Sequence, residues 1–234
     1  MYKFISLLTF LFAFNFSSAQ KLGVEFIIKN DSLPKKERRD FIYLNKETDI
    51  STARYIGRVK SSSKLKEIKF ALFFLQDKAQ KKGANSFQFV SSQNKNGVSE
   101  IIIDAYVIDE KTKLENETFF PKDKIYFFGK NNADGENTEE FKVNGEIQTL
   151  KPFQFSMISF DQSTTIQKGK ALGMTLKLKP QNNGRSFYLN FSGFGAVGGY
   201  AGNGGMGVSI SGGTITQMDE NIALLMTHIF TEKN

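Results

Sequence analysis

The clearest hydrophobic pattern in the chain predicts a helix from about residue 64 to residue 82. Serines at 61–63 offer an N-cap oxygen, and Gly83 offers a left-handed stop. Five apolar residues between these signals follow the three-four spacing of one helical face: Leu65, Ile68, Leu72, Leu75 and Ala79. Phe70, Phe73 and Phe74 widen the apolar surface, so we expect the helix to pack across a sheet.

Strand-like segments flank this predicted helix. Residues 54–59 precede it, residues 85–90 follow with Phe87 and Phe89 in alternation, and residues 100–108 are rich in Ile and Val. Asn96-Gly97 indicates a hairpin turn between the last two segments. The order strand, helix, strand, strand predicts a small α+β layer.

The second half of the chain has a different pattern. The polar stretch 109–118 is typical of a linker or an exposed crossing between domains. After it come short aromatic or β-branched segments separated by Gly, Pro or Asn: 124–128, 139–143, 146–150, 153–160, 174–179 and 186–191. This spacing predicts an antiparallel β-sandwich or barrel-like domain.

The predicted fold class is therefore α+β, a small β-α-β-β module followed by this β domain. We place a signal peptide at 1–19, the α+β module at 20–115 and the mainly antiparallel β domain at 116–234. The β domain includes a glycine-rich loop at 193–213, and its apolar segment 222–230 predicts a short C-terminal helix.

The N-terminus has the pattern of a secretory signal peptide. Lys3 precedes an apolar run from Phe4 to Phe16, and small residues at Ser17 and Ala19 predict cleavage before Gln20. The run is shorter than the roughly 20 apolar residues that span a bilayer. We expect an exported protein in the periplasm, at the outer-membrane periphery or secreted, with no transmembrane span in the mature chain. The segment resembles the signal peptides of exported Bacteroidota proteins.

Composition narrows the chemistry available to the chain. It has no Cys and one His, which excludes disulfides, thiolate zinc sites, iron–sulfur clusters and cysteine nucleophiles. We expect no metal and no cofactor. The formal net charge is +7, from 31 Lys+Arg against 24 Asp+Glu. Export argues against nucleic acid as the partner, so anionic lipid, acidic polysaccharide or a protein partner fits this charge better.

Two segments resemble known exported modules. Residues 75–85, with Lys78-Ala79 and Gly83-Ala84-Asn85 before a strand, resemble the helix-to-strand corner of RcsF and YbjQ-type envelope modules. That resemblance covers about 54–108 and implies a small α/β domain; the chain lacks the cysteines of RcsF, so no functional residue transfers. The strand 124–128, the turn 143–145 and the segment 187–189 resemble small exported bacterial β-domains of unknown function, which implies fold only.

A glycine-rich stretch is the most unusual feature of the composition. Eight glycines fall within the 15 positions 193–207, and residues 193–198 match the dinucleotide fingerprint G-x-G-x-x-G. In that fingerprint the third glycine opens a helix, whereas here further glycines follow and disfavour one. We interpret the stretch as a turned loop between strands, or as a backbone that approaches a ligand, lipid or partner closely.

Few residues are candidates for catalysis. The inner positions of residues 130–141 match a calcium-binding EF-hand loop, but Lys130 and Phe141 stand where that loop has its first and last acidic ligands. His228 falls off the apolar face of its predicted helix, so we expect it to be exposed, and no Gly-x-Ser-x-Gly elbow accompanies it. Two acid pairs remain by elimination: Glu139-Glu140 and Asp219-Glu220.

The sequence thus favours an exported, non-enzymatic cell-envelope protein that binds or scaffolds an envelope component or a protein partner. No catalytic residue is assigned. The candidate binding residues are Lys35, Lys36, Arg38, Arg39, Lys66, Lys69, Gly198, Gly199 and Tyr200. Two alternatives stay open: a secreted hydrolase that uses paired carboxylates on a β-scaffold, and a peripheral subunit of an envelope assembly.

Overall fold

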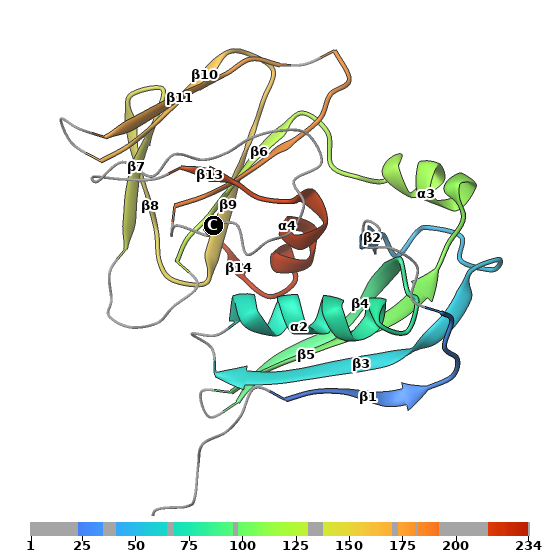
Figure 1. The fold of residues 1–234 in the computed structure, drawn as a ribbon. Coiled ribbons are helices and arrows are strands. Elements are labelled where there is room, and N and C mark those ends of the chain that lie inside the picture. The colour runs from blue at the N-terminus through green and yellow to red at the C-terminus, as the bar shows by residue number, and fades with distance from the viewer. Residues whose placement is uncertain are drawn as a thin grey trace, which may run out of the picture.

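The computed structural model describes residues 23–34, 41–64, 68–95, 98–130, 138–169, 173–180, 182–191 and 215–233, apart from the side chain of Lys69. These segments form an α+β fold with three helices and three β-sheets (Figure 1). The predicted signal peptide and the glycine-rich stretch lie outside the described residues. Within those residues, no helix has the length and apolar character needed to cross a membrane.

A five-stranded sheet is built from the first half of the chain. Its order is β1-β3-β5-β4-β2, and every neighbouring pair is antiparallel except β2 and β4. The strands are β1 (Gly23–Lys29), β2 (Ile42–Leu44), β3 (Arg54–Lys64), β4 (Ser86–Lys95) and β5 (Val98–Val107). Helix α2 (Ile68–Gln80), which lies within the predicted helical range, crosses one face of this sheet (Figure 1).

The opposite face of this sheet carries polar and charged side chains. Arg58 donates to both carboxylate oxygens of Asp104 at 2.8 and 2.7 Å, and the Tyr55 hydroxyl donates to the same carboxylate at 3.0 Å. Asp104 is largely buried although it lies on this outer face, so the charge of its carboxylate needs the two hydrogen bonds from the Arg58 guanidinium. These contacts tie β3 to β5 at the centre of the sheet.

The second half of the chain forms two further sheets. One has the order β11-β10-β7-β8 and the other β13-β12-β6-β9-β14. The second is mixed, because β12 is parallel to β6 and β14 is parallel to β9. The strands are β6 (Lys124–Phe128), β7 (Glu139–Val143), β8 (Glu146–Leu150), β9 (Gln154–Ser159), β10 (Thr164–Lys168), β11 (Met174–Leu178), β12 (Phe187–Asn190), β13 (Thr216–Gln217) and β14 (Thr231–Glu232).

One hydrophobic cluster joins these two sheets. It combines Phe127 of β6 and Leu189 of β12 with Phe141 of β7 and Ile166 of β10. Along β7, buried and exposed positions alternate, as expected for a strand with one face in the core. The alternation therefore decides which residues the two sheets bury between them.

A second hydrophobic cluster runs between the two halves of the chain. It includes Leu72 of α2 and Phe87 of β4 together with Tyr126 of β6, Tyr188 of β12 and Leu225 of helix α4 (Glu220–Thr227). Figure 1 shows α4 between the first sheet and the sheet that contains β6, β9 and β12. The inner face of the first sheet is thus covered partly by α2 and partly by the second half.

The segment 109–118, expected as a linker or exposed crossing, instead forms helix α3 (Glu110–Glu117). Asp109 caps it by accepting a hydrogen bond from the Thr112 amide at 2.8 Å. Asn116 is fully buried, donates to the Tyr43 carbonyl oxygen at 2.8 Å, and accepts from the amide of Asn45 and the hydroxyl of Thr48. The segment therefore holds β2 in place as well as connecting the two halves of the chain.

Candidate functional site

Helix α2 has one buried side and one exposed side. Five apolar residues are buried against the sheet: Ile68, Ala71, Leu72, Leu75 and Ala79. On the opposite side, Phe70 and Phe74 are 45% and 42% exposed. Because residues four apart share a helical face, these rings lie in one stripe, which continues to Lys78 and Lys81. We call Phe70, Phe74, Lys78 and Lys81 the aromatic–basic face.

This exposure corrects the expectation that the phenylalanines of the helix all widen its packing surface against the sheet. The buried stripe of α2 is complete without Phe70 and Phe74. Phe73 is half-buried, and its ring meets that of Phe74 edge-on, with 5.4 Å between centroids. The helix therefore leaves part of the surface of two phenylalanines exposed to solvent.

Positive charge is concentrated along the same helix. Residues 64–82 contain six lysines against Glu67 and Asp77, a net charge of +4 within a chain whose total is +7. Asp77 is paired with Lys81, with Nζ and Oδ2 2.6 Å apart. Lys78 stands in the last turn, where the helix dipole favours a cation. Among the described side chains, the exposed side of α2 thus combines Phe70 and Phe74 with Lys78 and the Asp77–Lys81 pair.

Most of the predicted binding residues cannot be placed by the structure. Lys35, Lys36, Arg38, Arg39, Lys66, Gly198, Gly199 and Tyr200 lie outside the described residues. Lys69 lies within α2, but its side chain is outside them as well. These nine residues stay predictions, and the aromatic–basic face is the part of the predicted basic helix surface that can be described.

The first acid pair, Glu139 and Glu140, does not form a shared carboxylate site. The two residues alternate across β7, so Glu139 is buried and Glu140 is exposed. Glu139 lies between two lysines, with Lys130 at 2.9 Å and Lys168 also in contact. Neutralisation of one buried carboxylate by two ammonium groups is a structural arrangement, and Glu140, on the other face of β7, does not share a site with it.

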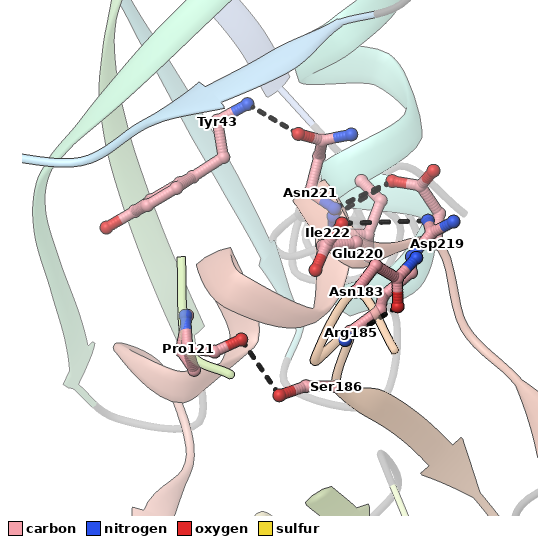
Figure 2. A network of polar contacts seen from close by, with 9 residues as sticks. All are labelled: Tyr43, Pro121, Asn183, Arg185, Ser186, Asp219, Glu220, Asn221 and Ile222. Atoms are coloured by element: carbon pink, nitrogen blue, oxygen red, sulfur yellow. Dashed lines mark hydrogen bonds and ion pairs between the residues drawn. The ribbon is translucent and has the colours of Figure 1, made fainter. Parts of the chain in front are cut away.

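The second acid pair is divided between two structural roles (Figure 2). Asp219 caps α4 by accepting from the amides of Asn221 and Ile222 at 3.0 and 3.2 Å. Glu220 faces Arg185, with 3.6 Å between Oε2 and the guanidinium. Burial raises the pKa of the Glu220 carboxyl, and the Arg185 charge opposes that rise. Each acid has its own partner, so the pair does not act together.

Beside Glu220 lies the buried hydroxyl of Tyr188. Among the described residues, it has no hydrogen-bond partner within bonding distance. Burial raises the pKa of Tyr188, and the negative charge of Glu220 raises it further. The ring of Tyr188 stacks on Tyr126, with centroids 5.1 Å apart. This tyrosine is therefore a neutral core residue at physiological pH.

His228 is exposed, as the sequence predicts, but its ring contacts two aromatic side chains. Its Nε2 lies 2.7 Å from the hydroxyl of Tyr43, and its ring stacks on Phe89 with 4.5 Å between centroids. Burial lowers the pKa of the imidazole. Ser92 donates to the carbonyl oxygen of His228 at 3.3 Å and not to the ring. Within the described part of the chain, the imidazole thus pairs with a tyrosine hydroxyl and not with the serine and acid that a hydrolytic triad requires.

Both ends of α4 hold Tyr43. Asn221, near its beginning, accepts a hydrogen bond from the Tyr43 amide at 2.9 Å, as Figure 2 shows. His228, the C-cap residue, contacts the Tyr43 hydroxyl. We call this arrangement the Tyr43 clasp. It fixes the second half of the chain on β2 through two contacts that lie 178 and 185 residues apart in sequence.

The described segments also show how few groups are available to hold a metal ion or a ligand. No group of three or more His, Asp or Glu side chains comes together within the described ranges as a metal site would require. A shallow hollow at the end of the β10–β11 hairpin is lined by Lys142, Gln167, Gly169, Gly173, Met174 and Thr175. This lining contains one cation and no acid, so it offers no pair of groups for acid–base catalysis.

Comparison with family models, curated proteins and solved structures found no match to this chain. The candidate site is therefore argued from the chemistry and geometry of the chain itself.

Proposed function

We propose that this chain is an exported, non-enzymatic protein of the cell envelope that binds an anionic envelope component through the exposed side of α2. The observation that carries the proposal is the basic sequence in and around this helix, a net charge of +4 over residues 64–82, together with the two half-exposed phenylalanines of α2. Fixed positive charge on one surface attracts phosphate or carboxylate groups.

Two further observations support this proposal. The N-terminal pattern of Lys3, apolar run and Ala19-Gln20 junction is that of an exported protein. Glu139, Asp219 and Glu220 each have a structural partner, which favours binding over hydrolysis. The resemblance of residues 54–108 to RcsF and YbjQ-type envelope modules points to the same compartment.

We also propose the finer architecture that the sequence suggested. The β-α-β-β module would occupy the first half, and the two later sheets would form a β-sandwich over 116–234. The shared cluster of Phe127, Phe141, Ile166 and Leu189 supports the sandwich. In this arrangement the sandwich supports the module through α4, and the module carries the binding helix.

Retention on an immobilised sulfated polysaccharide tests the proposed anion binding. The mature chain, residues 20–234, is expected to bind at about 0.05 M NaCl and to elute below about 0.5 M, because salt screens exposed charges. A variant with Lys78→Gln, Lys81→Gln and Lys82→Gln should elute at clearly lower salt. Retention independent of salt, or no retention, would contradict the proposal.

A matched variant controls for the loss of three charges. Lys151, Lys177 and Lys179 are exposed and lie in the second half of the chain, away from α2. Their replacement by glutamine lowers the net charge equally, yet it should shift elution less than the α2 variant. Equal shifts would mean that total charge, and not the helix surface, determines binding.

A further inference from the structure

The edge strands of the three sheets differ in how their outer sides are protected. An edge strand offers free backbone N–H and C=O groups to any further strand, so natural sheets keep such strands short, interrupt them with bulges or cover them. Strands β13 and β14 have two residues each. A bulge between Phe26 and Ile28 interrupts β1. These three edges are therefore poor templates for a further strand.

Side chains from other elements protect two further edges. In β2, the Tyr43 amide donates to Asn221, and the Tyr43 carbonyl oxygen accepts from Asn116. In β8, the Thr149 carbonyl oxygen accepts a hydrogen bond from Lys233 Nζ at 2.9 Å. Groups of the chain itself thus bond to the backbone of both strands.

Strand β11 differs from these five edges. It pairs with β10 through five consecutive residue pairs without a bulge, and among the described residues no strand pairs with its other side. Met174 and Leu176 are half-buried against the core between the two sheets. Thr175 and Lys177, on the opposite face, are exposed. A regular edge strand whose apolar side chains are only partly covered is a template for a further strand.

The sequence of β11 is complementary to a second copy of itself. Two identical antiparallel strands related by a two-fold axis place one residue opposite its own copy. With Leu176 at that position all five residues overlap, and the apolar Met174 lies opposite Leu178 of the second copy. On the other face, Thr175 lies opposite Lys177 of the second copy. A register centred on Lys177 would instead oppose two like charges, which is unfavourable.

We propose that two copies of this chain associate by antiparallel pairing of their β11 strands, with Leu176 opposite its own copy. The sheet β11-β10-β7-β8 would continue across the two-fold axis, and the apolar face between the sheets would extend over Met174 and Leu176. One strand pair buries less surface than a standard interface, so we expect a weak dimer at concentrations on the order of 10 to 100 μM. Helix α2 takes no part in this contact.

Charge substitutions at Thr175 test the pairing. Thr175→Glu places a carboxylate opposite Lys177 of the second copy at two symmetric positions, so it should tighten the dimer about fivefold, whereas Thr175→Lys should weaken it about fivefold. Sedimentation velocity of the mature chain over a range of concentrations measures both changes. The matched controls are Thr149→Glu and Thr149→Lys, at an exposed threonine on the opposite edge of the same sheet, and they should change the dissociation constant less than about twofold.

The absence of cysteine from the chain permits a test of the register. In the proposed pairing, Leu176→Cys brings two cysteines directly opposite each other, with Cα atoms about 4.5 to 5.5 Å apart, which suits a disulfide. Thr175→Cys leaves its two copies diagonal to each other, about 7 to 8 Å apart, which is too far for ready bonding. We therefore expect mild oxidation to convert Leu176→Cys to a covalent dimer about tenfold faster than Thr175→Cys.

The outcomes either support or overturn the pairing. A concentration-dependent dimer that Thr175→Glu tightens and Thr175→Lys weakens, with cross-linking through Leu176→Cys, supports it. A chain that stays monomeric at concentrations on the order of 500 μM overturns it. A dimer that is indifferent to charge at Thr175, or that cross-links through Thr175→Cys instead, also overturns it. Circular dichroism establishes that each variant is folded, and the exposed Thr175 variants decide the matter if Leu176→Cys is not.

Discussion

Replacement of Asn116 by alanine is expected to lower the free energy of unfolding by about 3 to 5 kcal/mol. Its amide donates to the Tyr43 carbonyl oxygen and accepts from the Asn45 amide and the Thr48 hydroxyl, all at 2.7 to 2.8 Å. Truncation leaves these partners without hydrogen bonds in a site that is closed to water. Each such group costs about 1 to 3 kcal/mol.

Urea unfolding of the mature chain measures this change. Glu115→Ala is the matched control, since Glu115 is exposed on the same helix and its replacement should alter stability by less than about 0.5 kcal/mol. A loss below about 1 kcal/mol for Asn116→Ala would mean that α3 does not anchor β2 as described. The anchoring matters because β2 also carries Tyr43, on which α4 is held.

His228→Ala is expected to lower the free energy of unfolding by about 2 to 4 kcal/mol. The variant loses the stacking on Phe89 and leaves the buried Tyr43 hydroxyl without its partner. His228→Phe keeps an aromatic ring on Phe89 and should lose about half as much. Combining His228→Phe with Tyr43→Phe removes both polar groups, so the double variant should lose less than the two single losses added.

The same histidine gives stability a defined pH dependence. Burial holds the folded pKa of His228 below its ordinary value of 6.5, so the unfolded chain binds the proton more readily. The stabilising contribution is therefore complete above about pH 6.5 and is lost as the pH falls through 6.5 toward the folded pKa. His228 is the only histidine in the sequence, which makes the assignment simple.

The comparison of wild type with His228→Phe isolates this effect. Glu220 acts in the opposite sense, because its raised pKa favours the folded state as the carboxyl becomes protonated, but it is present in both proteins. The stability difference between them should shift in favour of His228→Phe as the pH falls from about 7.5 to about 5.5. A difference that is constant over this range would contradict the Tyr43 clasp as described.

Local patterns in the sequence predicted much of the secondary structure. The helix at α2 follows from three-four spacing that ends before Gly83, whereas the serines at 61–63, expected to cap it, lie in β3. Strands β6, β7 and β8 coincide with the segments predicted from their β-branched and aromatic residues. These elements carry their own signals, because each is long enough to show a period. The β4–β5 ladder likewise closes with the pair Lys95 and Val98, on either side of the two residues predicted to form a hairpin turn.

Elements that depend on distant partners were missed. Strand β2 has only three residues, too few for a period, and α3 buries only Thr112 and Asn116, so it shows no apolar stripe. The sequence could not show that Asn116 reaches Tyr43, or that His228 lies between Tyr43 and Phe89. Such contacts come from the strand order and from the packing of α4, which no local pattern determines.

The candidate site was predicted in part. The lysines in and around α2 can be counted in the sequence, and their number predicts a basic helix surface. The exposure of Phe70 and Phe74 could not be predicted, because a wide apolar stripe on a helix is compatible with contact on either side. A simple signal for it exists in retrospect: both phenylalanines lie about 100° to 160° around the helix from Leu72 and Leu75.

The proposed export underlies the proposed partners and the expectation that nucleic acid is not among them. Intact-mass measurement of the endogenous protein, recovered from separated cytosolic and envelope or secreted fractions, tests it most directly. The expected result is a chain that begins at Gln20, 19 residues shorter than the full sequence, recovered outside the cytosol. Recovery of the full chain with Met1 from the cytosol would contradict it.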